Sequence, residues 1–69
     1  MKLSARNQIP GKILNVQKGQ TTSHVVIDIG HGVALTSSIT NEAVDELQLK
    51  PGDSAIAIIK ASDVMVGKS

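Results

Sequence analysis

Three short polar clusters are the parts of this chain whose residue types could do chemistry. They are Ser4-Ala5-Arg6-Asn7-Gln8, Thr36-Ser37-Ser38-Ile39-Thr40 and Lys60-Ala61-Ser62. Each cluster combines small residues with hydroxyl groups, and the first and third add a cation. Small side chains let a ligand approach backbone N–H groups, hydroxyls donate single hydrogen bonds, and a helix start presents unpaired amides. This set of donors suits a compact anion, although each cluster taken alone is also an ordinary surface sequence.

The same inventory argues against catalysis and against a metal-cation site. Cysteine is absent, which excludes thiolate chemistry, disulfides and a Cys-ligated zinc. His24 and Asp28 lie four residues apart in an expected strand, so they share a face rather than forming part of a nucleophilic triad. His31 lies seven residues after His24, in an expected turn, and the two histidines make no metal-ligand pattern. We therefore expect a protein that is not an enzyme and binds no bare metal ion.

Size and composition indicate that the chain gains stability from self-association and from a ligand. It has 69 residues and no Phe, Tyr or Trp, so a single domain over residues 1–69 must build its core from small aliphatic side chains. Folding is marginal for so short a chain unless an oligomer or a bound ligand contributes. The longest apolar stretch, Ala55–Ile59, is too short to span a bilayer, and the N-terminal residues lack the apolar region of a signal peptide. We expect a cytoplasmic location.

The hydrophobic periodicity predicts an all-β fold with one short helix. Apolar residues alternate with polar ones between residues 21 and 29 and again between 33 and 39, which is typical of half-buried strands. Thr40 or Asn41 can cap a helix that ends at Leu47. The remaining strands are expected over residues 11–16, 55–59 and 64–66. This order predicts a five-stranded OB-type barrel with its helix between strands 3 and 4; a compact SH3-like barrel is the alternative.

Oligonucleotide binding is the rival function for an OB-type barrel. Such surfaces stack bases on aromatic side chains along a cationic groove. This chain has no aromatic residue and a net charge of only +1, with seven Lys plus Arg against six acids. Neither stacking nor a strong electrostatic attraction to nucleic acid is therefore expected. We expect no nucleic-acid or membrane partner.

Several of these residues together resemble one family. The chain resembles the molbindins in several short segments. These are Ser4–Gln8, Gly11-Lys12, Ile39-Thr40, and Lys60-Ala61-Ser62 with Val64-Met65. The molbindins are small Mop-type proteins whose domain also occurs in molybdate-responsive regulators and transporter ATPases. The resemblance covers essentially the whole chain, and the five-residue opening is its most specific part. A module separated from such a larger protein is a further hypothesis.

The resemblance implies a ligand, an assembly and a set of contacts. It implies molybdate or tungstate, with no other cofactor, bound at the interfaces of a homohexamer built as a trimer of dimers, for storage or homeostasis. The opening of one subunit would meet the helix start and the late lysine segment of another, so that Arg6 of one copy faces Lys60 of the next. One relative carries Ser where this chain has Ala43, so a contact there would come from the backbone N–H. The implied site residues are Ser4, Ala5, Arg6, Thr40, Ala43, Lys60, Ala61 and Ser62.

Overall fold

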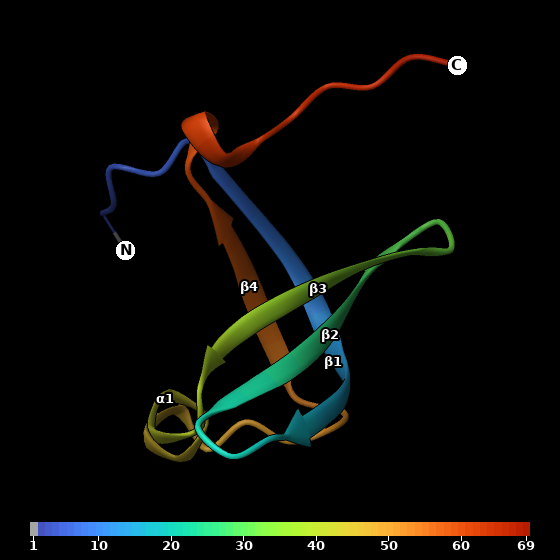
Figure 1. The fold of residues 1–69 in the computed structure, drawn as a ribbon. Helices are drawn as coiled ribbons and strands as arrows, with labels where there is room; N and C mark the ends of the chain where they lie inside the picture. Colours follow the sequence, from blue (N-terminus) through green and yellow to red (C-terminus); the bar gives the residue numbers. More distant parts are fainter. Residues whose placement is uncertain (1) are drawn as a thin grey trace.

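A four-stranded antiparallel sheet with one short helix makes up the fold. The computed structural model describes residues 2–69 (Figure 1). Helix α1 lies between β3 and β4, and a single 3₁₀ turn, η1, follows β4. The elements are β1 (Asn7–Lys18), β2 (Thr22–Gly30), β3 (Val33–Thr40), α1 (Asn41–Leu47), β4 (Ser54–Ile59) and η1 (Ala61–Asp63).

The long strand β1 holds the sheet together, because two different strands pair along its two halves. The order is β3-β2-β1-β4. Residues 7–12 of β1 pair with β4, whereas residues 12–18 pair with β2. The register shifts between Ile13 and Asn15, as in a β-bulge, and a bulge bends a strand and increases its twist. The sheet therefore curls around β1, and β3 crosses in front of β1 and β4 in the view of Figure 1.

The turn between β2 and β3 has the backbone that a tight hairpin needs. His31 and Gly32 both have positive φ, 56° and 73°. Two consecutive positive φ values characterise the type I′ turn, whose twist matches that of the flanking strands. Asp28 supports the turn, because its carboxylate accepts a hydrogen bond of 2.9 Å from the Gly30 N–H.

The core is small and entirely aliphatic. Its buried members are Ile13, Val25, Ile27, Val44 and Ala57. Val44 is the one buried residue of α1, so the helix covers one end of the curled sheet with a single side chain. With no aromatic side chain available, the core is completed by half-buried residues from every strand, among them Ile9, Leu35 and Ile39.

Most of the expected architecture is confirmed, but the expected fifth strand is not. The all-β class, the helix up to Leu47 and its place before the fourth strand agree with the structure. Within residues 2–69, Val64–Val66 form no strand, because no other strand of the same chain lies beside them to supply backbone hydrogen bonds. Strands β3 and β4 also do not pair with each other, so this chain alone does not close a barrel.

Gly11 is required where β1 passes over β2. A Cβ built at this position would overlap the carbonyl oxygen of Asp28 and lie 2.8 Å from Cγ2 of Ile27. We predict that Gly11→Ala lowers the free energy of unfolding by about 1–3 kcal/mol, the usual cost of overpacking. Urea denaturation followed by far-UV circular dichroism measures this. Gly67→Ala, where nothing lies within 4 Å, is the matched control and should leave the midpoint unchanged; equal midpoints for both variants would contradict the assignment.

Candidate functional site

The first and third polar clusters lie at the same end of the sheet. Asn7, the first residue of β1, pairs with Ile59, the last residue of β4. The Asn7 side chain strengthens this contact by donating a hydrogen bond of 3.1 Å to the Ile59 carbonyl. The segments just outside these two strand ends therefore emerge next to each other, as Figure 1 shows for the N-terminal segment and η1. We call these residues the terminal cluster: Ser4, Ala5, Arg6, Lys60, Ala61 and Ser62.

The terminal cluster brings two cations and several hydrogen-bond donors to one place. Among residues 2–69, the ion pairs are Lys18–Asp45 (2.6 Å) and Lys50–Asp53 (3.2 Å), so neither Arg6 nor Lys60 is neutralised by a carboxylate. Arg6 and Lys60 are exposed, whereas Ala5, the residue before Arg6, is buried. The burial of Ala5 holds the N-terminal segment against the body of the protein, while the two cations stay accessible to an anion.

The turn η1 adds backbone donors to this cluster. Its hydrogen bonds run from the Asp63 N–H to the Lys60 carbonyl (2.9 Å) and from the Val64 N–H to the Ala61 carbonyl (3.3 Å). The N–H groups of Ala61 and Ser62, at the start of the turn, take part in neither bond. Both residues are exposed and have small side chains, so a ligand could approach these amides closely.

Thr40 and Ala43 lie at the opposite end of β1. Thr40 caps α1, because its Oγ1 accepts a hydrogen bond of 3.0 Å from the Ala43 N–H. The threonine hydroxyl therefore has its own hydrogen left to donate to a ligand. The Ala43 N–H is already engaged in the cap, so the backbone contact expected from Ala43 would have to be shared with Thr40.

Asn41 fixes the helix start to the turn between β1 and β2. Its backbone N–H donates to the Thr21 carbonyl (2.9 Å), and its side-chain Nδ2 donates to the carbonyls of Gly19 (3.0 Å) and Gln20 (3.3 Å). Its Oδ1 accepts a short hydrogen bond from the hydroxyl of Ser23, which is fully buried. Asn41 thus fixes the position of Thr40. The sequence had suggested Asn41 only as an alternative N-cap of the helix.

Within one chain, therefore, the residues of the terminal cluster lie at one end of β1, and the start of α1 lies at the other. Asn41 bonds to the turn that follows β1, whereas the terminal cluster flanks the residue where β1 begins. Arg6 and Lys60 flank neighbouring strand ends of one chain, and the expectation that Arg6 of one copy faces Lys60 of another stays a prediction. A site that also includes Thr40 needs a second subunit.

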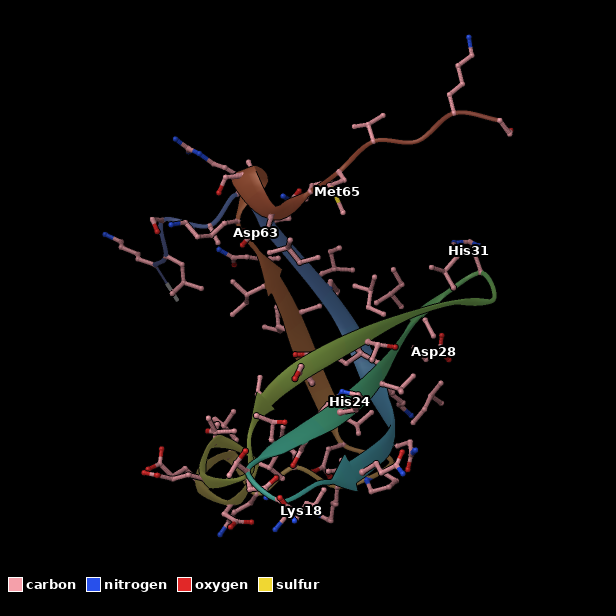
Figure 2. The ribbon with its side chains drawn as sticks, in the orientation of Figure 1. Lys18, His24, Asp28, His31, Asp63 and Met65 are labelled. Atoms are coloured by element: carbon pink, nitrogen blue, oxygen red, sulfur yellow. The ribbon has the colours of Figure 1, made fainter. Side chains whose placement is uncertain are left out.

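The remaining polar residues form no competing site. His24 lies on β2 and His31 at the tip of the β2–β3 hairpin, and Figure 2 shows them well apart. In the part of the chain that the structure describes, no three His, Asp or Glu residues are placed to hold a metal ion. Within the same residues, no helix is long and apolar enough to cross a membrane.

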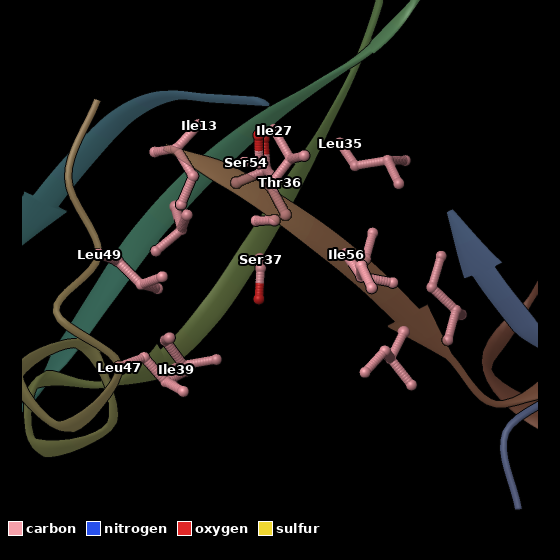
Figure 3. A pocket seen from close by; sticks show the side chains of 15 residues that line it. Ile13, Ile27, Leu35, Thr36, Ser37, Ile39, Leu47, Leu49, Ser54 and Ile56 are labelled. Atoms are coloured by element: carbon pink, nitrogen blue, oxygen red, sulfur yellow. The ribbon is translucent and has the colours of Figure 1, made fainter. Parts of the chain in front are cut away.

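An open groove of about 770 Å³ lies between β3 and β4 (Figure 3). Its walls include Leu35 and Ile39 from β3, Ile56 and Ile58 from β4, and Leu47 at the end of α1. Because these walls are mainly aliphatic and carry no cation, the groove does not suit an anion. It is a second feature of the surface, separate from the terminal cluster.

Comparison with known proteins identifies the family. The TOBE domain family matches residues 3–66. The chain belongs to the TOBE domain family. The probable molybdenum-pterin-binding protein of Haemophilus influenzae is 51% identical over 67 residues, which cover 97% of each chain. The expected resemblance to Mop-type proteins is therefore confirmed for this TOBE domain.

Two solved structures have the same TOBE fold. A molybdate-binding protein from Sporomusa ovata superposes with a TM-score of 0.92 at 35% identity, covering 99% of this chain and 100% of that one. The cytoplasmic molybdate-binding protein ModG, solved with molybdate bound, gives a TM-score of 0.89 at 45% identity. The match covers 94% of this chain and 46% of ModG, so this TOBE domain corresponds to about half of that protein.

The contact between Ser23 and Asn41 yields a test of the helix anchor. We predict that Asn41→Ala destabilises the fold by about 1–3 kcal/mol, because it leaves the buried Ser23 hydroxyl without a partner. The double variant Ser23→Ala/Asn41→Ala should lose clearly less than the sum of the two single variants, since no buried polar group is then left unpaired. Urea denaturation of the four proteins measures the coupling, and strictly additive losses would show that the two side chains do not depend on each other.

Proposed function

We propose that this TOBE domain binds molybdate, and tungstate as a tetrahedral dianion of nearly the same size, for intracellular storage and homeostasis without catalysing a reaction. The observation that carries the proposal is the terminal cluster, where Arg6 and Lys60 flank the paired residues Asn7 and Ile59 and neither forms an ion pair among residues 2–69. The close relatives named for molybdenum-pterin binding or molybdate binding support the choice of ligand. ModG, which is described as cytoplasmic, supports the same location for this chain.

The chemistry of the cluster suits a doubly negative tetrahedral oxyanion. Hydrogen bonds in which the donor or the acceptor is charged are shorter and about twice as strong as neutral ones. The guanidinium of Arg6 and the ammonium of Lys60 would supply such bonds. The hydroxyls of Ser4 and Ser62 and the amide N–H of Ala61 would donate hydrogen bonds to the remaining oxygens of the anion. An ion of charge −2 would also offset the repulsion between the two cations. Selectivity over sulfate would come from the larger radius of molybdate in a cage of fixed donors.

The complete site, in this proposal, lies between copies of the chain. Thr40 and Ala43 sit at the far end of β1 from the terminal cluster, so they can reach an ion held there only from another subunit. Each copy then offers one half-site at each end, and repetition of this contact gives a closed ring when the rotation between copies closes. A homohexamer built as a trimer of dimers, the assembly implied by the resemblance, satisfies this requirement.

Replacement of Lys60 tests the ligand assignment. We predict that Lys60→Ala weakens molybdate binding roughly 10- to 100-fold, because a hydrogen bond to a charged group contributes about 1.5–3 kcal/mol. Isothermal calorimetry with molybdate, and with sulfate as the competing tetrahedral dianion, measures the effect. Lys12→Ala is the matched control, since Lys12 is an exposed cation in the middle of β1, and it should bind as the parent protein does. Unchanged molybdate affinity in Lys60→Ala would remove Lys60 from the site.

Mixing two defective variants tests whether subunits share the site. Arg6→Ala removes the guanidinium at one end of the chain, and Thr40→Val removes the hydroxyl donor at the other. If the halves come from different copies, co-refolding an equal mixture recreates sites in which both halves are intact. We predict that binding by the mixture exceeds the average of the two pure variants, as measured by molybdate retained after gel filtration. Binding equal to that average would show that each site is built within one chain.

A further inference from the structure

Asn7 lies between the two cations of the terminal cluster without being one of its proposed donors. It directly follows Arg6, and its register partner Ile59 directly precedes Lys60. Its side-chain Nδ2 donates a hydrogen bond of 3.1 Å to the Ile59 carbonyl. Both residues are half-buried, so water competes less for this bond than it would at an exposed position. One side chain therefore joins the two strand ends beyond which the proposed donors lie.

The carbonyl that Asn7 holds belongs to the peptide unit that also carries the Lys60 N–H. A peptide unit is planar, so a bond to its oxygen fixes the direction of its N–H and the position of the next Cα. The pairing of β1 with β4 ends here, because Lys60 lies outside β4. Lys60 is instead the N-cap of η1: its carbonyl accepts from the Asp63 N–H (2.9 Å), and its side chain makes no capping bond within the described chain. The position of η1 relative to the sheet therefore depends on this peptide unit.

We propose that Asn7 is a positioning residue of the terminal cluster and determines the size of the oxyanion that the cluster selects. This role rests on the proposed function, because it concerns the same donors. Through the Ile59 carbonyl, Asn7 holds the Lys60 side chain and the amide N–H groups of Ala61 and Ser62 in a fixed direction from the start of β1. Asn7 thus acts on the ion through Lys60 and η1.

Donors that cannot move discriminate between ions that differ in size alone. Molybdate and sulfate are both tetrahedral dianions, so neither charge nor shape separates them, and the spacing of the donors must do so. If Lys60 and η1 could shift relative to the sheet, they would close around the smaller sulfate and regain its hydrogen bonds. A peptide unit held by Asn7 prevents this shift, and a site is selective only when its supporting contacts hold the donors to within about 0.5 Å.

Removal of the Asn7 donor tests its role in size selection. Asn7→Leu keeps a side chain of similar size, and Asn7→Ala is a second variant that also lacks the donor. We predict that the ratio of molybdate to sulfate affinity falls about three- to tenfold in both, the factor that corresponds to one neutral hydrogen bond. Isothermal calorimetry with each anion measures the ratio. Asp28→Ala is the matched control, because it removes a side-chain bond to the Gly30 N–H (2.9 Å) at the β2–β3 hairpin, and it should leave the ratio unchanged.

A measurement without ligand follows the donors themselves. In amide correlation spectra of the ligand-free protein, Asn7→Ala should shift the signals of Lys60, Ala61 and Ser62 and lower their heteronuclear NOE, whereas Asp28→Ala should leave all three unchanged. Unchanged signals at these three residues in Asn7→Ala would overturn the proposal.

The binding data separate this proposal from the proposed function. A parent protein that binds neither anion would remove the proposed function, and size selection by Asn7 with it. A parent protein that prefers molybdate, together with Asn7→Leu and Asn7→Ala variants that keep the same ratio, would remove the role of Asn7 alone.

Discussion

The pairing of β1 with two different strands, β4 along its first half and β2 along its second, is the constraint on which the rest of the molecule depends. The strand can pair with both only because Gly11 lets it lie close to β2. This arrangement fixes the curl of the sheet and the place of both polar regions. The terminal cluster stands where β1 begins, and the helix start is bonded to the turn where β1 ends. A change in the pairing of β1 would therefore move both regions at once.

A small aliphatic core and an incomplete barrel have the same physical origin. Without aromatic side chains, the chain buries only a handful of residues fully and leaves large apolar groups exposed along the groove and the tail. The proposed anion would neutralise the cations of the terminal cluster, and a ligand that binds only the folded protein stabilises it. In a site shared between copies, the same ligand would also favour their association, and ligand and association are the two sources of stability open to so short a chain.

Patterns within a few residues predicted the secondary structure well, but they do not indicate which strands, far apart in the sequence, pair with each other. The cap at Thr40, the end of α1 at Leu47 and the alternation in β2 and β3 follow from side-chain chemistry within a few residues. The start of β1 at Asn7 was missed, because Pro10 and Gly11 ordinarily end a strand, and Asn7 reveals its role only through its bond to Ile59. The sequence identified the site residues as three clusters. It could not tell which of them share an end of the sheet, because that depends on the pairing of β1 with β4.

The hydrogen bond by which Thr40 caps the helix has a consequence for ligand discrimination. Because Oγ1 accepts a hydrogen bond from the Ala43 N–H, the Thr40 hydroxyl has its hydrogen free to donate to a ligand. The side chains of Arg6 and Lys60 have no hydrogen-bond acceptor, and an amide N–H only donates. Most groups of the proposed site would therefore donate hydrogen bonds to the ligand rather than accept them. Molybdate and sulfate carry no proton at neutral pH, whereas phosphate keeps at least one. A site lined mainly by hydrogen-bond donors would therefore disfavour a protonated oxyanion such as phosphate. This discrimination would act in addition to any selection by size or charge.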